Sequence, residues 1–240
     1  MYDWPEARAE VDAQWARLRE ALRRRGIDAP EALTRENTAE GTLDLAVLWR
    51  DPALLLAQTC WGPMEMGLAD HVQVIGQPDY SDCEGGQGEF YSSAVVMRRD
   101  GPSPEKDVRA PPDGLAVLPL DRLRGKSFAF NGTDSMSGVL ALTRDLEALG
   151  ESLALFGERI ETGGHRASLR AVAQGRADVA AIDCRSWKLF GRFEPDISRR
   201  MQVVGWTARR KGLPFITAGS TPRSVVVALR DALAEAMPAS

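Results

Sequence analysis

The chain has 240 residues, 44% of them hydrophobic, and its 30 basic and 34 acidic side chains give a formal net charge of -4. This length is enough for one large α/β domain or two smaller ones, each with a buried core. The two signs of charge are interleaved, so the composition does not favour binding to nucleic acid or to an anionic membrane. The apolar runs are far shorter than the ~20 residues of a membrane-spanning helix, which excludes membrane insertion.

The first residues lead directly into a charged helical pattern, without the basic and then apolar segments of an export signal. The sequence by itself therefore predicts a cytosolic protein. We expect an amphipathic helix over residues 4–25, with Asp3 as its N-cap and Glu6 completing a capping box. A second helix is expected over residues 43–49, and the segments that follow predict strands over 54–58, 72–75 and 93–97 and a Gly-rich loop over 80–88.

Residues 100–114 are rich in proline and charge and predict a surface excursion or a linker. From residue 115 onward the pattern alternates regularly. Predicted strands cover 127–130, 156–161, 178–182, 201–206 and 215–217, and predicted helices cover 138–149, 166–174, 186–193 and 222–236. Strands that alternate with helices of this length indicate an α/β fold whose parallel or mixed sheet is covered on both faces.

Three successive strand ends carry polar side chains. The first is followed by Ser135, Met136, Ser137 and Gly138, at the start of a predicted helix. Backbone N–H groups and the positive end of the helix dipole favour an anion there, although a serine at this position also serves as an ordinary helix cap. His165 follows the second strand and Asp183 ends the third. In open α/β sheets ligands bind at this edge, so we expect these groups to share one site.

Residues 162–183 read TGGHRASLRAVAQGRADVAAID, residues 120–126 read LDRLRGK and residues 134–138 read DSMSG. These segments resemble the phosphonate and phosphate substrate-binding proteins of ABC transporters, a family whose members are usually periplasmic. The resemblance implies a two-lobed type II periplasmic-binding fold with mixed sheets and a two-strand hinge. We expect lobe 1 to comprise residues 1–92 and about 201–240, and lobe 2 to comprise residues 93–200.

By this resemblance, Ser135 and Ser137 bind the ligand oxygens, His165 joins them, and Asp183 meets a protonated group of the ligand. Tyr80 and Tyr91 are expected to form a wall of the first lobe. Thr59, Met136 and Gly138 complete the predicted ligand-binding set. Because Asp134 adds a negative charge beside this site, its side chain is expected to point away.

The function implied is the clamping of a small oxyanion, such as phosphate or a phosphonate, between two lobes, with an ABC permease as the further partner. The alternative is a cytosolic enzyme of the same fold that acts on a small carboxylate or phosphorylated metabolite. No acid/base pair is recognisable, so no catalytic residue is assigned. Two histidines 94 positions apart, without a CxxC motif, predict no metal site, and no cofactor is expected.

Three cysteines, Cys60, Cys83 and Cys184, are too few for a disulfide scaffold. Reduced thiols are predicted for a cytosolic chain, and buried apolar packing is favoured over a nucleophilic or redox role. Cys60 and Cys83 follow two predicted strands of the first lobe. We expect them to lie near each other, and whether they form a disulfide depends on the compartment, since they could pair if the protein were exported.

Overall fold

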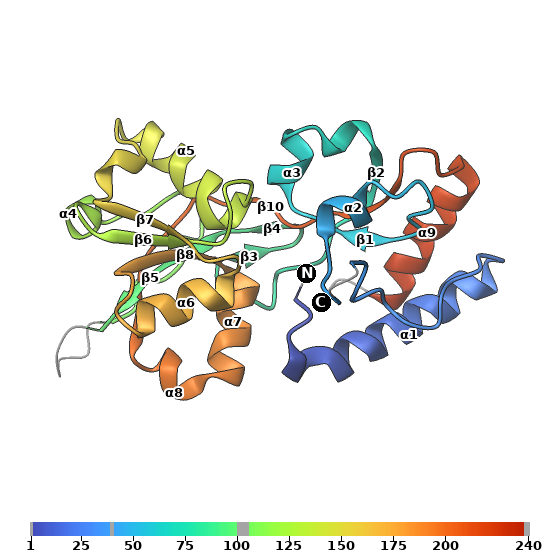
Figure 1. Ribbon diagram of the computed structural model, residues 1–240, viewed down its shortest axis with the longest axis horizontal. Helices are drawn as coiled ribbons and strands as arrows, with labels where there is room; N and C mark the ends of the chain where they lie inside the picture. Colours follow the sequence, from blue (N-terminus) through green and yellow to red (C-terminus); the bar gives the residue numbers. More distant parts are fainter. Residues whose placement is uncertain (1, 39–40, 100–105, 238–240) are drawn as a thin grey trace. The chain divides into compact units, whose positions relative to one another are not determined.

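A computed structural model describes residues 2–38, 41–99 and 106–237. The chain divides into two compact units (Figure 1). Unit 1 comprises Met1–Pro78 and Gly212–Ser240, and unit 2 comprises Asp79–Lys211. The chain therefore leaves unit 1 and returns to it once.

Unit 1 contains a three-stranded antiparallel sheet in the order β1-β11-β2, and long helices α1 and α9 pack against each other. Apolar side chains of these two helices form one core cluster with Ile75 of β2, and a second cluster includes Trp49 and Met64. The elements of unit 1 are η1 (Pro5–Ala7), α1 (Arg8–Arg24), α2 (Leu45–Trp49), β1 (Ala57–Gln58), α3 (Trp61–Glu65), η2 (Leu68–Asp70), β2 (Val72–Gly76), β11 (Phe215–Ala218) and α9 (Arg223–Ala236).

The predicted capping box at the first helix is wrong. Asp3 accepts two hydrogen bonds from the Arg35 guanidinium, at 2.6 and 3.0 Å, and this pairing lowers the pKa of Asp3. A bidentate, charge-assisted pair outcompetes a neutral backbone N–H for the same carboxylate. The strand predicted over residues 54–58 is also shorter than expected, because only β1 at its end pairs regularly with β11.

Unit 2 is built on a mixed five-stranded sheet in the order β7-β6-β8-β5-β9. β6 is parallel to β7 and β8, whereas β5 is antiparallel to β8 and β9. A small second sheet has the order β10-β4-β3. The strands of unit 2 are β3 (Gly86–Gln87), β4 (Phe90–Tyr91), β5 (Ser93–Arg98), β6 (Ser127–Phe130), β7 (Glu158–Glu161), β8 (Val179–Asp183), β9 (Met201–Trp206) and β10 (Arg210–Lys211).

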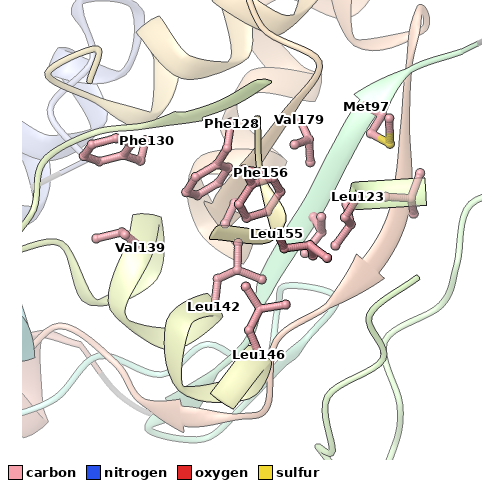
Figure 2. Packing of buried hydrophobic residues seen from close by; sticks show 13 residues of the cluster. Met97, Leu123, Phe128, Phe130, Val139, Leu142, Leu146, Leu155, Phe156 and Val179 are labelled. Carbon is pink, nitrogen blue, oxygen red and sulfur yellow. The ribbon is translucent and has the colours of Figure 1, made fainter. Parts of the chain in front are cut away.

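Helices cover both faces of the five-stranded sheet, with α5 on one face and α6 and α7 on the other (Figure 1). Alternate strand residues serve the two faces, as a period of two requires. Phe128 and Phe156 stack with ring centroids 4.7 Å apart in the cluster beneath α5 (Figure 2). The helical elements of unit 2 are α4 (Leu120–Leu123), η3 (Met136–Leu140), α5 (Ala141–Ala148), η4 (Leu153–Leu155), α6 (His165–Ala173), α7 (Cys184–Phe193) and α8 (Pro195–Ser198).

The boundaries of unit 2 differ from those expected for lobe 2. Residues 79–92 and 201–211 belong to unit 2, although the sequence pattern assigned them to lobe 1. The reason is strand pairing, since β9 forms a ladder with β5 and so completes the same sheet. Arg210 strengthens this placement through a bidentate ion pair with the buried carboxylate of Asp145 on α5.

Candidate ligand-binding site

The serine turn, residues 131–138, connects β6 to the helix formed by η3 and α5. Ser135 is the N-cap, and its hydroxyl oxygen accepts a hydrogen bond from the Gly138 N–H at 3.0 Å. The first turn is a π-turn, in which the Leu140 N–H reaches back five residues to the Ser135 carbonyl at 3.1 Å. π-Turns of this kind are frequent at functional sites. Ser135 and Ser137 are both buried, and Asp134 is exposed.

Gly138 is required by close packing. A Cβ atom at this position would lie 1.6 Å from Oδ1 of Asn131 and 2.9 Å from Oγ of Ser135. The Asn131 amide therefore occupies the space that any larger residue would need. Within the described part of the chain, Asn131 Oδ1 is buried and has no hydrogen-bond partner. A buried polar atom of this kind is a rarity that points to a functional or strained position.

His165, the first residue of α6, meets the serine turn. Its Nε2 lies 2.8 Å from the Ser137 hydroxyl oxygen and 3.2 Å from Oδ2 of Asp183. Burial lowers the pKa of His165, and the negative charge of Asp183 and the backbone of Ala181 only partly oppose this effect. The imidazole is therefore neutral at pH 7, and a proton on Nε2 satisfies both oxygen atoms. The Ser137 hydroxyl then accepts from His165 and keeps its own hydrogen for another acceptor.

This arrangement does not match a Ser-His-Asp catalytic relay. In such a relay the hydroxyl and the carboxylate bind opposite nitrogens of the imidazole, so that the proton moves across the ring. Here Ser137 and Asp183 both meet Nε2. Nδ1 of His165 is buried and finds no hydrogen-bond partner among the described residues. The geometry fits the fixing of a neutral imidazole rather than the activation of a nucleophile.

Asp183 has two structural tasks. It ends β8 and is the N-cap of α7, where its Oδ1 accepts a hydrogen bond from the Ser186 N–H at 2.9 Å. Its Oδ2 faces His165. The residue is only 2% exposed. Both carboxylate oxygens thus already have partners, and Asp183 positions the imidazole.

Ser93 is a member of this cluster that the sequence pattern did not indicate. Its hydroxyl donates to the carbonyl oxygen of Ser137 at 2.9 Å, and its N–H donates to the Thr207 hydroxyl at 2.8 Å. Ser93 stands opposite Asp183 in the β5–β8 register. The residue begins an apolar strand pattern, so only the strand pairing reveals its contact with the serine turn.

The two predicted tyrosines form an aromatic pair in unit 2. Tyr80 and Tyr91 are buried, with ring centroids 5.2 Å apart, and Arg185 lies 4.5 Å above the Tyr80 ring. Both tyrosines belong to unit 2, so the expectation that they line the first lobe is wrong. They follow the chain into unit 2 because β4 pairs with β3 and β10 there.

Two further predicted residues have other surroundings. Thr59 belongs to unit 1, where its fully buried hydroxyl has no hydrogen-bond partner among the residues that the structure describes. Met136 lies in the serine turn, but its side chain is buried and its sulfur accepts from Arg144 Nη1 at 3.6 Å. Only the backbone of Met136 is therefore a candidate for ligand binding.

Residues 62–239 match the family model for the periplasmic substrate-binding protein of phosphonate ABC transporters. The chain belongs to this family. Its members are periplasmic proteins that bind a small-molecule ligand and serve a transporter, and the match does not support the enzymatic alternative. The expectation of a cytosolic protein stays a prediction.

Solved structures share the fold of this family member at low sequence identity. PhnD1 from Prochlorococcus marinus in complex with methylphosphonate is 16% identical with a TM-score of 0.65, over 93% of this chain and 78% of that chain. A chloride-bound protein from Xanthomonas citri is 19% identical with a TM-score of 0.60, over 90% and 74%.

The binding protein of a Pseudomonas aeruginosa phosphonate transporter is 14% identical with a TM-score of 0.60, over 93% and 68%. The curated protein sequences give no significant match. Over residues 2–38, 41–99 and 106–237, no helix has the length and apolar character needed to cross a membrane.

Proposed function

We propose that this substrate-binding protein binds a small tetrahedral oxyanion, a phosphonate or phosphate, at the serine turn of unit 2 and delivers it to an ABC permease. The observation that carries the proposal is the state of the two serine hydroxyls. Ser135 accepts from the Gly138 N–H, and with the proton of the neutral His165 assigned to Nε2, Ser137 accepts from that nitrogen. Each hydroxyl hydrogen is therefore available to an external acceptor.

The backbone contributes less than the sequence pattern suggested. We expected the N–H groups of residues 135–138 to hold the anion together. The Ser135 N–H, however, donates to the Gly132 carbonyl at 3.1 Å, and the Gly138 N–H donates to the Ser135 hydroxyl. Two of the four donors are thus used inside the turn. The proposed site depends on the hydroxyl hydrogens, on the N–H groups of Met136 and Ser137, and on the positive end of the helix dipole.

Relatives support the chemical class of the ligand. The family is described by phosphonate transport, and the PhnD1 structure holds methylphosphonate. A site of neutral donors suits such ligands, because hydrogen bonds from hydroxyl and N–H groups to an anion contribute about 1.5–3 kcal/mol each. The nearby negative charge of Asp183 is expected to favour a monoanion over a fully ionised dianion.

Calorimetric titration tests this proposal directly. Phosphate, methylphosphonate, aminoethylphosphonate and sulfate are titrated into the wild type and into a Ser135→Ala/Ser137→Ala double variant. The loss of both hydroxyl donors is expected to weaken binding by roughly two to four powers of ten. Ser152→Ala is the matched control, since Ser152 caps η4 through the Ala154 N–H and takes no part in the site.

The control variant should retain wild-type affinity. If none of the four oxyanions binds the wild type, the proposed ligand class is wrong. If an oxyanion binds and the double variant keeps its affinity within about threefold, the site lies elsewhere and the serines only cap the helix.

A further inference from the structure

Two thiols in unit 2 have no task in the proposed binding site. Cys184 is the first residue of α7, and Cys83 lies in a tight turn that spans residues 80–86. The Cys83 N–H donates to the Tyr80 carbonyl at 2.9 Å, and the Cys83 carbonyl accepts from the Gly86 N–H at 2.9 Å. Both cysteines are buried and neither forms a disulfide.

The turn at residues 80–86 is fixed to the first turns of α7. Lys188 Nζ lies 2.7 Å from Asp82 Oδ2 and donates to the Asp82 carbonyl at 2.8 Å. Arg185 donates to the Asp79 carbonyl and to Asp82 Oδ1, the latter at 3.3 Å. Asp82 directly precedes Cys83, and Arg185 directly follows Cys184. These contacts hold the two backbone segments together independently of the thiols.

The two thiols also interact directly. A hydrogen bond with Cys184 lowers the pKa of Cys83, while the same bond, together with burial, raises the pKa of Cys184 well above its usual value. The Cys83 thiol in turn donates to Asp82 Oδ1 at 3.3 Å. The positive charge of Arg185 also lowers the pKa of Cys83, whereas burial and the Asp82 carboxylate oppose this effect. Cys60 belongs to unit 1, so its expected proximity to Cys83 stays a prediction, whereas Cys184 belongs to the same unit as Cys83.

We propose that Cys83 and Cys184 form a reversible disulfide that ties the turn at residues 80–86 to the start of α7. The oxidant is a disulfide, either a small molecule such as glutathione disulfide or the disulfide of a protein oxidoreductase. This inference is independent of the proposed ligand, because it depends only on contacts within unit 2.

The chemistry balances as two exchange steps. The Cys83 thiolate attacks one sulfur of glutathione disulfide, the S–S bond of that molecule breaks, and one glutathione leaves as a thiolate. Cys184 then loses its proton and attacks the Cys83 sulfur of the mixed disulfide, and the second glutathione leaves. Two protein thiols are oxidised to one disulfide, and one glutathione disulfide is reduced to two glutathione molecules.

The cross-link would enclose about 100 residues, which include most of the five-stranded sheet. A loop of this length loses much conformational freedom in the unfolded chain when its ends are joined. Because the two segments are already held together, the disulfide should introduce little strain. The oxidised protein is therefore expected to melt at a higher temperature than the reduced one, by roughly 5 °C or more.

The experiment equilibrates the full chain in glutathione buffers of increasing oxidised fraction, followed by thiol counting and non-reducing peptide mapping. Two of the three thiols should disappear, and residues 83 and 184 should appear in one linked peptide. Cys60→Ser is the matched control and should still lose two thiols. Cys83→Ser should form no intramolecular disulfide and should show no oxidation-dependent rise in melting temperature.

Burial slows attack on the native chain, so the reduced and unfolded protein is also refolded in the same buffers. This route gives the oxidant access to both thiols. A Cys83–Cys184 link by either route, with the higher melting temperature, supports the proposal. Retention of all three thiols by both routes, a link that involves Cys60, or a disulfide that lowers the melting temperature would overturn it.

Discussion

Two helix starts in unit 2 occupy equivalent positions, one after β6 and one after β8, yet they differ in the residue that caps them. Ser135 accepts from the N–H three residues further along the first helix, and Asp183 does the same for α7. The serine hydroxyl still carries a hydrogen that an anion can accept. The aspartate carboxylate has no hydrogen to donate and repels an anion. The topology thus provides two candidate anion sites, one at each helix start. We call the start capped by Ser135 the open start, because it can donate a hydrogen bond to an anion, and the start capped by Asp183 the closed start, because it cannot.

The helix start of α6 lies between these two in the sequence and contributes a side chain to the same cluster. α6 begins after Gly164 without a side-chain cap, within the part of the chain that the structure describes. Its contribution to the cluster is the imidazole of His165, which lies between Ser137 and Asp183. The neutral imidazole contacts Ser137 of the open helix start and Asp183 of the closed one. It orients the Ser137 hydroxyl without adding a positive charge.

The largest effect on oxyanion affinity is expected for Ser135→Asp, which gives the open helix start the same capping residue as the closed one. Aspartate caps helices as well as serine does, but Ser135 is buried, so the added carboxylate should also lower the free energy of unfolding and urea denaturation must show that the variant is folded. A carboxylate in the turn should weaken oxyanion binding by about a thousandfold or more, because it removes a donor and adds repulsion. Calorimetry and urea denaturation measure the two effects. If the Ser135→Asp variant retained wild-type affinity, the claim that an aspartate cap prevents anion binding would be wrong.

Gly138→Ala tests whether stability and binding at the open helix start depend on the close packing of Gly138 against Asn131. The new Cβ would overlap the Asn131 amide, so the expected loss is about 1–3 kcal/mol of stability together with binding. Gly164→Ala is the control, since nothing lies within 4 Å of a Cβ there and the backbone is extended. That variant should be nearly neutral in thermal melting. Equal losses in the two variants would contradict the packing argument.

Asp183→Asn tests the repulsion assigned to the closed start. Asparagine can still accept the Ser186 N–H, so α7 should keep its cap. Removal of the negative charge is expected to raise the affinity for dianionic phosphate about tenfold and to affect a monoanion less. Titrations of phosphate above and below its second pKa provide the measurement. A lower affinity for both species would mean that the charge of Asp183 supports binding.

The smallest expected effect concerns the pH dependence of stability. Because burial lowers the pKa of His165 in the folded state, the unfolded chain takes up this proton first as the pH falls. The free energy of unfolding should therefore decrease below about pH 6.5, by at most about 1.4 kcal/mol per pH unit. His165→Gln should show a shallower decrease between pH 7.5 and 5.5 in urea denaturation. An identical slope would show that His165 does not titrate differently in the two states.

Much of unit 2 was predictable, because its core pattern is local. The expected strands at residues 127–130 and 201–206 coincide with β6 and β9, and the alternation of strands and helices indicated a sheet covered on both faces. The two-residue strands β3, β4 and β10 carry too few residues for a periodic pattern. Their pairing, and with it the true limits of unit 2, depends on contacts between distant segments.

The site residues likewise include some that were predictable from the sequence and one that was not. Ser137, His165 and Asp183 were expected to meet because the strands before them end at one edge of one sheet, and the structure places them in contact. Ser93 was missed because it reaches that edge from an antiparallel strand much earlier in the chain. Ser137 and Asp183 both contact Nε2 of His165. This detail depends on side-chain geometry and cannot be predicted from the spacing of residues in the sequence.

The π-turn at Met136–Leu140 has a consequence for sequence length. A π-turn amounts to one extra residue within a helix, and each residue rotates the helix by about 100°. Deletion of one residue here would allow an ordinary α-turn to form, and the serines before it would rotate away from His165 although their identities were unchanged. When relatives of this protein are aligned, a gap inside residues 135–140 should therefore mark a chain that has lost the turn, even where both serines are retained.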